Sequence, residues 1–217
     1  MKVTTEGCLF GAWLAAQSRE PRRILDIGAG TGLLMLMTAQ AFKCPVEGIE
    51  LDPEAASQAG QNFEASPWAE RLKVHTGDVK TYLPDVEYDL VVSNPPFHSR
   101  SLKSEDGKVN MARHDDTLPL QELLQAADRL MSADGSFAVW LPIPRAEEMA
   151  ALAGNEGWRI RHRLRVARKK GEEPFRNLMV LKRASCEMSE DSVHIRETDG
   201  AYGERFAAWL KPYYLNL

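Results

Sequence analysis

The stretch ILDIGAGTG, from Ile24 to Gly32, joins a short apolar run to three glycines at alternate positions. The run Ile24–Ile27 has the length and composition of a buried strand, and glycines directly after a strand allow a sharp turn and close approach of a ligand. The segment TGLLMLMTAQAF that follows predicts a helix with Thr31 as its N-cap. A strand, a glycine loop and a helix with free N–H groups at its start are typical of an α/β ligand-binding fold.

Strands and helices continue to alternate after this loop. PVEGIE predicts a second strand ending at Glu50, and Asp52 with Pro53 opens the next helix. Further strands are expected in RLKVHTGDV, YDLVVSNPPF and GSFAVWLP, and further helices in LPLQELLQAADRLM and RAEEMAALAGNEG. The alternation implies a mostly parallel sheet with helices on both faces.

The two ends of the chain depart from this alternation. MKVTTEGCLFGAWLAAQSRE predicts a helix of the same domain, because its apolar run is too short to span a bilayer and it lacks a cleavage signature. The segment from Arg159 to Val166 alternates strictly, turns through Gly171 and meets a second apolar run at Leu178 to Leu181. This pattern predicts a C-terminal antiparallel hairpin. On its first strand, one face would carry Arg159, Arg161, Arg163 and Arg165, and the other would carry Ile160, His162, Leu164 and Val166.

Composition restricts the classes of protein and of site. The 217 residues suit one domain spanning residues 1–217, and 44% hydrophobic with 27% charged residues are ordinary for a globular protein. Three cysteines without C-x-x-C spacing support neither a disulfide framework nor a zinc site. We therefore expect a monomeric cytoplasmic protein without a metal or a membrane segment.

The net charge of −4 hides an asymmetry. Residues Arg159 to Arg183 contain ten Lys/Arg and two Asp/Glu, which leaves 17 basic against 29 acidic residues for the rest of the chain. A basic patch on an acidic body is the expected footprint of a nucleic-acid partner, but basic runs are also common on solvated surfaces.

Acidic residues accompany the ends of three expected strands. Asp26 precedes the glycine loop, Glu50 ends the second strand, and Asp78 follows the third. The spacing G-x-G-x-G differs from the G-x-G-x-x-G of dinucleotide enzymes, and Glu50 is placed to accept hydrogen bonds from both hydroxyls of a ribose. Asp78 could meet an adenine amino group or, equally, cap a helix.

This combination resembles the class I S-adenosylmethionine-dependent methyltransferases over nearly the whole chain. The resemblance implies a Rossmann-like, mostly parallel seven-stranded sheet and S-adenosylmethionine as the cofactor. It also implies a set of residues that hold the cofactor: Asp26, Gly28, Gly30, Gly32, Glu50, Asp78 and Asn94.

The expected fourth strand ends in an unusual sequence, Asn94-Pro95-Pro96-Phe97. An exocyclic amine is a poor nucleophile, because its lone pair is delocalised into the ring. Acceptors directed at both of its hydrogens would stabilise the charge that develops as it attacks a methyl group. The Asn94 side chain and the Pro95 carbonyl provide two acceptors, the prolines fix the backbone, and Phe97 offers a face for stacking a base.

Asn-Pro-Pro followed by an aromatic residue resembles the signature of methyltransferases that act on amino or amide nitrogen. That group includes adenine-N6 enzymes, guanine-N2 enzymes of ribosomal RNA and glutamine enzymes, and NPPFH alone favours the guanine enzymes. The segments MKVTTEGCLFGAW, ARHDDTLPLQELL and GAYGERFAAWLKPYYLNL instead resemble the family that methylates N6 of the adenine beside the anticodon of a valine tRNA. This resemblance implies a tRNA partner and a further segment before Met1. A non-catalytic RNA-binding module on the same scaffold is the remaining alternative.

An RNA substrate gives the basic residues a candidate role. We expect phosphate contacts from the hairpin, with a solvated sheet face as the alternative reading, and contacts to the target nucleotide from the loop after Phe97, where capping of the next helix is equally expected. The candidate residues are Arg113, His114, Arg161, Arg163, Arg165, Arg168, Lys169 and Lys170.

Overall fold

The structure is a computed structural model that describes residues 4–17, 19–96 and 118–216. Its strands are β1 (Ile24–Ile27), β2 (Val46–Glu50), β3 (Leu72–Thr76), β4 (Tyr88–Ser93), β5 (Met131–Pro142), β6 (Arg159–Lys169), β7 (Arg176–Lys182) and β8 (Ser189–Arg196). Its helices are α1 (Thr5–Gln17), α2 (Leu33–Ala41), α3 (Pro53–Glu64), α4 (Leu120–Leu130), α5 (Ile143–Asn155) and α6 (Glu204–Leu210), with a short 3-10 turn at Ala69–Arg71.

All described strands belong to one sheet with the order β3-β2-β1-β4-β5-β7-β6-β8. Strand β7 alone among them runs antiparallel to its neighbours, so the expected mostly parallel sheet and C-terminal hairpin are confirmed. The expected number of seven strands is wrong, because β8 adds an eighth at the edge beside β6. Its sequence SEDSVHIR begins with four polar residues and therefore lacks the apolar run that indicates a strand.

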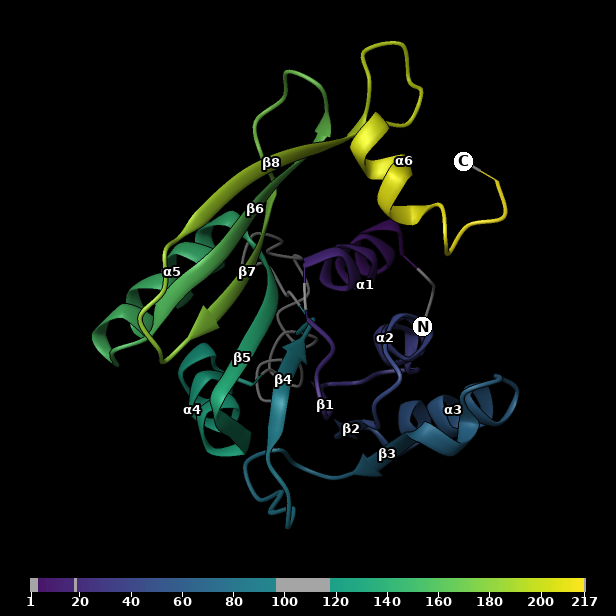
Figure 1. Ribbon diagram of the computed structural model, residues 1–217, viewed down its shortest axis with the longest axis vertical. Coiled ribbons are helices and arrows are strands. Elements are labelled where there is room, and N and C mark those ends of the chain that lie inside the picture. Colours follow the sequence, from purple (N-terminus) through teal and green to yellow (C-terminus); the bar gives the residue numbers. More distant parts are fainter. Residues whose placement is uncertain (1–3, 18, 97–117, 217) are drawn as a thin grey trace, which may run out of the picture.

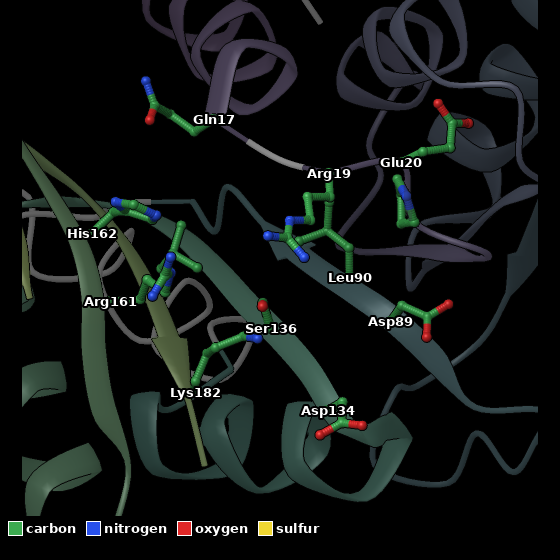
Figure 2. A pocket seen from close by; sticks show the side chains of 12 residues that line it. Gln17, Arg19, Glu20, Asp89, Leu90, Asp134, Ser136, Arg161, His162 and Lys182 are labelled. Atoms are coloured by element: carbon green, nitrogen blue, oxygen red, sulfur yellow. The ribbon is translucent and has the colours of Figure 1, made fainter. Parts of the chain in front are cut away.

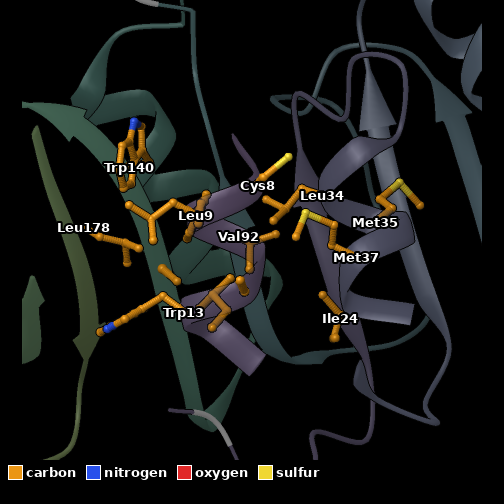
Figure 3. Packing of buried hydrophobic residues seen from close by; sticks show 14 of the residues in the cluster. Cys8, Leu9, Trp13, Ile24, Leu34, Met35, Met37, Val92, Trp140 and Leu178 are labelled. Atoms are coloured by element: carbon orange, nitrogen blue, oxygen red, sulfur yellow. The ribbon is translucent and has the colours of Figure 1, made fainter. Parts of the chain in front are cut away.

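Helices cover both faces of this sheet (Figure 1). Side chains of α1, α2, α3 and α6 pack on one face, which we call the α1 face, and those of α4 and α5 pack on the other, the α5 face. Trp140 of β5 lies in the middle of the α1 face, where its ring stacks on Phe10 at a centroid distance of 6.3 Å. Figure 3 shows Leu9 of α1 between Trp140 and Val92 of the sheet, with Trp13 of the same helix below them.

The N-terminal helix is buried along most of its length. Residues 7–14 of α1 are buried, including Leu9 and Phe10 with no exposed surface. The segment Thr5–Gln17 therefore forms a helix of the core, as expected from its sequence. In the described part of the chain, no helix has both the length and the apolar composition needed to cross a membrane.

Strand β6 contains an irregularity between Ile160 and His162, where its register with β7 shifts. Ile160 consequently packs on the α5 face, whereas Leu164 and Val166 pack on the α1 face. The expected arrangement of four arginines on one face is therefore wrong, since strict alternation requires a regular strand.

Strands β1, β2 and β4 end at the same edge of the sheet. Asp26 of β1 lies beside Gly48 of β2 on one side and Val92 of β4 on the other. The glycine loop, Glu50 and Asn94 consequently emerge side by side. In an open α/β sheet this carboxyl edge is where ligands bind.

Candidate active site

The glycine loop adopts a backbone conformation that disfavours other residues. Gly28, Gly30 and Gly32 have φ angles of +76°, +56° and +83°. A β-carbon at Gly32 would lie 2.4 Å from the Phe63 ring, so this glycine allows α3 to pack against the loop. A β-carbon at Gly28 would meet nothing within 4 Å, which leaves open space above the loop. The two glycines therefore serve different purposes, close packing at Gly32 and ligand access at Gly28.

The helix after the loop begins later than expected. Gly32 is the N-cap of α2, and its first helical residue is Leu33. The prediction of Thr31 as the N-cap is wrong, and the Thr31 carbonyl instead accepts a hydrogen bond of 2.9 Å from the Asn62 side chain on α3. Helix α3 thus holds the loop from outside, while its own start is capped by Asp52 as expected.

Glu50 connects the glycine loop to the second strand. One of its carboxylate oxygens accepts a hydrogen bond of 2.7 Å from the Gly30 N–H, and the other accepts one of 3.0 Å from the Asp52 N–H. Each carboxylate oxygen can accept more than one hydrogen bond, so Glu50 retains acceptor capacity toward a ligand. The structure thus brings Glu50 and Gly30 together, as the strand order requires.

Asp26 lies beneath the loop and is 2% exposed. Burial raises the pKa of its carboxyl to about 8, and the negative charge of Glu50 adds to the effect. A cationic group bound at the loop would favour its ionised form. The site therefore contains a carboxyl whose charge depends on what lies nearby.

Asp78 follows β3 and lies beside Glu50, because the Gly77 N–H donates to the Glu50 carbonyl at 2.8 Å. The Asp78 carboxylate accepts a hydrogen bond of 2.9 Å from the Lys80 N–H and stabilises a turn. Its side chain is 37% exposed. Asp78 thus stabilises its own turn and still presents part of its carboxylate to solvent.

Asn94 is the first residue after β4. Its side chain is half-buried and makes no hydrogen bond with residues 4–17, 19–96 or 118–216. The buried Ser93 hydroxyl before it donates to the Ile27 carbonyl at 2.8 Å, which ties the end of β4 to the start of the glycine loop. An amide held beside the loop with its hydrogen-bonding groups free is suited to binding a polar substrate group.

Helix α1 forms one wall of the site through Gly7. A β-carbon at Gly7 would lie 3.2 Å from Leu33 Cδ2 and 4.0 Å from Asn94 Nδ2. The Gly7 N–H also donates a hydrogen bond of 3.1 Å to the Thr4 hydroxyl oxygen. The first turn of α1 is therefore in contact with both α2 and Asn94.

Three residues of the site were missed by sequence reasoning. Ser93, Gly7 and Arg129 act through partners that lie far away in the sequence, and only Ser93, which precedes the proline motif, had a local signal. The Arg129 guanidinium on α4 donates to the carbonyls of Val79 at 2.7 Å and Tyr82 at 2.5 Å and so holds the loop that follows Asp78.

The remaining predicted site residues lie next to the segment 97–117 or within it, and the structure does not describe that segment. Pro95 is half-buried and Pro96 is exposed. Phe97, Arg113 and His114 lie outside the described residues, so their expected roles stay predictions. Among the residues the structure describes, no three His, Cys, Asp or Glu side chains gather closely enough to hold a metal ion.

Known proteins resemble the chain along its whole length. A family model described as methyltransferase small domain matches residues 10–141. A tRNA1(Val) (adenine(37)-N6)-methyltransferase from Tolumonas auensis is 39% identical over 219 residues, which cover 100% of this chain and 91% of that protein. The chain belongs to this methyltransferase family. A protein of the same name from Yersinia pestis is 38% identical over 220 residues, covering 100% of this chain and 88% of that protein.

Solved structures share the fold of this methyltransferase. A predicted O-methyltransferase from Agrobacterium tumefaciens has a TM-score of 0.72 at 21% identity, covering 97% of this chain and 99% of that one. A glycopeptide N-methyltransferase in complex with S-adenosylmethionine has a TM-score of 0.59 at 11% identity, covering 81% of this chain and 94% of that one. At these identities the likeness establishes the Rossmann-like methyltransferase fold.

In this methyltransferase the basic hairpin is largely neutralised by its own neighbours. Arg163 pairs with Glu147 of α5 at 3.4 Å, Arg165 with Glu190 of β8, and Lys170 with Glu197 at 3.1 Å. Arg168 lies over the Phe175 ring at 4.1 Å. Within the described ranges, Arg161 and Lys169 are the two of the six predicted hairpin residues without such a partner.

Proposed function

We propose that this protein transfers a methyl group from S-adenosylmethionine to N6 of the adenine beside the anticodon of a valine tRNA. The observation that carries the proposal is the position of Asn94 directly beside the glycine loop, with side-chain polar groups that bind no other described residue. The names of the relatives, which match the whole chain at 38–39% identity, support adenine in tRNA over the guanine, glutamine and non-catalytic alternatives.

The residues at the carboxyl edge fit this cofactor. Gly28 leaves space for the methionine part, Glu50 has acceptors for the ribose hydroxyls, and Asp78 has an acceptor for the adenine amino group. Leu51, which is 58% exposed beside Glu50, offers an apolar surface to the adenine ring. When bound, S-adenosylmethionine supplies a methyl group attached to positively charged sulfur.

The chain's own contribution to catalysis is the orientation of the amine. The Asn94 side-chain oxygen and the Pro95 carbonyl accept hydrogen bonds from the two N–H groups of adenine N6, so that the nitrogen becomes more tetrahedral and its lone pair is less delocalised into the ring. Two prolines hold these acceptors in place, since their φ angles are fixed. Preorganised acceptors stabilise the positive charge that develops on the amine, so no separate base is needed before attack. Phe97 stacks on the target base in this proposal.

Basic residues of the hairpin and of the segment after Phe97 would bind the RNA. Of the six predicted hairpin residues, Arg161, Arg168 and Lys169 are left available for phosphates, because they lack carboxylate partners in the described structure. Arg113 and His114 contact the target nucleotide, and the paired Arg163, Arg165 and Lys170 contribute less to RNA affinity. The chain acts as one methyltransferase domain and as a monomer in the cytoplasm.

Replacement of Asn94 by alanine tests the proposal. Asn94→Ala removes one acceptor from the developing charge and should lower kcat roughly 100- to 1,000-fold, the usual cost of losing one such group. Its affinity for S-adenosylmethionine, measured by calorimetry, should change by less than about threefold, and Asn155→Ala at the exposed end of α5 serves as the control. Methyl transfer by Asn94→Ala at the wild-type rate would refute the assigned role.

A further inference from the structure

A pocket lies at the amino ends of the strands, at the edge of the sheet opposite the glycine loop. It encloses about 470 Å³ between the end of α1, the start of β4 and the hairpin (Figure 2). Its charged lining consists of Arg19, Glu20, Asp89, Asp134, Arg161 and Lys182. Leu90, which also lines it, is four residues before Asn94, a rise of about 13 Å along a strand, so the pocket is separate from the methyl-transfer site.

Three cations with no described partner converge on this pocket. Arg19, Arg161 and Lys182 come from the segment after α1, from β6 and from β7. None of their side chains makes an ion pair or hydrogen bond within residues 4–17, 19–96 and 118–216. Figure 2 shows the head groups of Arg19 and Lys182 directed toward the middle of the pocket, near the Ser136 hydroxyl. Most other basic side chains of the hairpin are neutralised, so Arg161 and Lys182 hold part of the charge that the hairpin keeps free.

The acidic residues of the pocket are largely engaged elsewhere. Asp89 accepts hydrogen bonds from the Arg22 guanidinium, from the Arg22 N–H at 3.0 Å and from the Arg23 N–H at 3.2 Å. Glu20 accepts one of 2.6 Å from the Lys43 N–H. Asp134 lies at the lower end of the pocket in Figure 2, apart from the three cations. The side of the pocket bounded by Arg19, Arg161 and Lys182 is therefore positive.

The neutral polar groups on this side add hydrogen-bond donors. Gln17 and Ser136 line the pocket with the cations, and His162 lies beside Arg161. Burial and the adjacent Arg161 charge lower the pKa of His162, so its ring is neutral at pH 7 and donates one N–H. Guanidinium groups match the oxygens of phosphate in pairs, and an ammonium adds a point charge.

We propose that this pocket binds a phosphate group at a site separate from the methyl-transfer centre. The phosphate belongs either to the backbone of the RNA substrate or to a small phosphorylated molecule, and the volume suits a ligand of nucleotide size. The proposal does not depend on the methyl acceptor, because it concerns binding at the opposite edge of the sheet.

Titration with inorganic pyrophosphate tests this proposal directly. Calorimetry of the wild-type protein should show saturable binding, and Arg161→Gln with Lys182→Gln together should weaken it at least about tenfold, as expected for the loss of two charge-assisted contacts. Lys73→Gln, which removes an exposed cation of β3 that does not line the pocket, should leave the affinity unchanged. Thermal melting confirms that the variants fold. The proposal is overturned if pyrophosphate does not bind, or if the double variant binds it as tightly as the wild type.

Binding of tRNA distinguishes the two sources of phosphate. If the RNA backbone occupies the pocket, pyrophosphate competes with tRNA and the double variant lowers the slope of log affinity against log salt by about 1 to 2. If a small molecule occupies it, tRNA affinity stays at the wild-type value while pyrophosphate binding is lost. Either result supports the phosphate site, and neither requires methyl transfer.

Discussion

At the scale of single residues, Asp26 carries a carboxyl that the fold holds out of water. Burial first, and the charge of Glu50 second, raise its pKa to about 8. Between pH 4 and pH 8 the unfolded chain ionises this group while the folded chain keeps it protonated. The folded state binds the extra proton, so the contribution of Asp26 to stability falls as the pH rises through this range.

Asp26→Asn should remove this pH dependence. Asparagine resembles the protonated acid in shape and charge, so the variant should match the wild type near pH 4 and gain in relative stability toward pH 8, by at most about 1.4 kcal/mol for each pH unit. Urea unfolding at several pH values measures the difference, with the exposed Asp85→Asn as the control. A constant difference between wild type and Asp26→Asn at all pH values would show that Asp26 is ionised in the folded protein.

The glycines of the loop differ in what a side chain would cost. Gly28→Ala and Gly32→Ala should each lose about 1–2 kcal/mol of stability from a positive φ. Gly32→Ala should lose about 1–3 kcal/mol more, because its β-carbon collides with the Phe63 ring. Gly28→Ala instead should raise the Kd for S-adenosylmethionine, because its β-carbon enters the space that the cofactor would occupy. Equal unfolding energies for the two variants would contradict the separate roles.

Most residues of the candidate site could be predicted individually from the sequence. Asp26, Glu50 and Asn94 each stand at the end of a strand, and parallel strands bring their carboxyl ends together, so their proximity followed from the order of elements. Gly7 and Ser93 could not be assigned in this way, because their importance arises from contacts with Asn94 and with Ile27 across the fold.

At the scale of elements, α4 supports the loop that carries Asp78. Arg129 on this helix donates to the carbonyls of Val79 and Tyr82. Arg129→Met keeps the apolar stem and removes the donors, so it should destabilise the protein by about 1–3 kcal/mol. The looser loop should raise the Kd for S-adenosylmethionine severalfold while kcat at saturating cofactor stays near wild type.

Calorimetry and steady-state kinetics of this variant separate the two effects. Arg145→Met on α5, where the arginine pairs with Glu148 three residues later at the surface, is the matched control. If Arg129→Met lowers stability without changing the Kd, the residue supports the core alone and does not position the Asp78 loop.

Elements also differ in how well their sequences predicted them. Strands β1, β2 and β4 and helix α3 were predicted from apolar runs and from the Asp52-Pro53 start. The bulge in β6 was not, because the letters RIRHRLRV alternate regardless of a local register shift. Its cause is tertiary packing, because Ile160 packs on the α5 face and Leu164 on the α1 face. Residues an even number of positions apart on a regular strand point to the same face, so an irregularity between these two residues is required.

At the scale of the whole molecule, charge is arranged differently from its distribution in the sequence. The basic segment from residue 159 to 183 folds against acidic side chains of α4, α5 and β8, among them Asp128, Glu147 and Glu190. The count of Lys and Arg therefore overstates the positive surface of the hairpin. What remains free lies partly in the pocket of Arg19, Arg161 and Lys182.

The two edges of the sheet consequently present different chemistry. The carboxyl edge combines the glycine loop, Glu50 and Asn94, which suit a nucleoside cofactor and an amine. The amino edge presents unpaired cations, which suit phosphate. A tRNA is large enough to reach both edges, whereas a small amine substrate is not.

The identity of the methylated base tests the central claim most directly. Transcribed valine tRNA is incubated with the protein and S-adenosylmethionine labelled in the methyl group, then digested to nucleosides and separated by mass. We predict labelled N6-methyladenosine, and its loss when the adenine beside the anticodon is replaced by guanine. Labelled N2-methylguanosine, or undiminished labelling of the tRNA that lacks this adenine, would contradict the account.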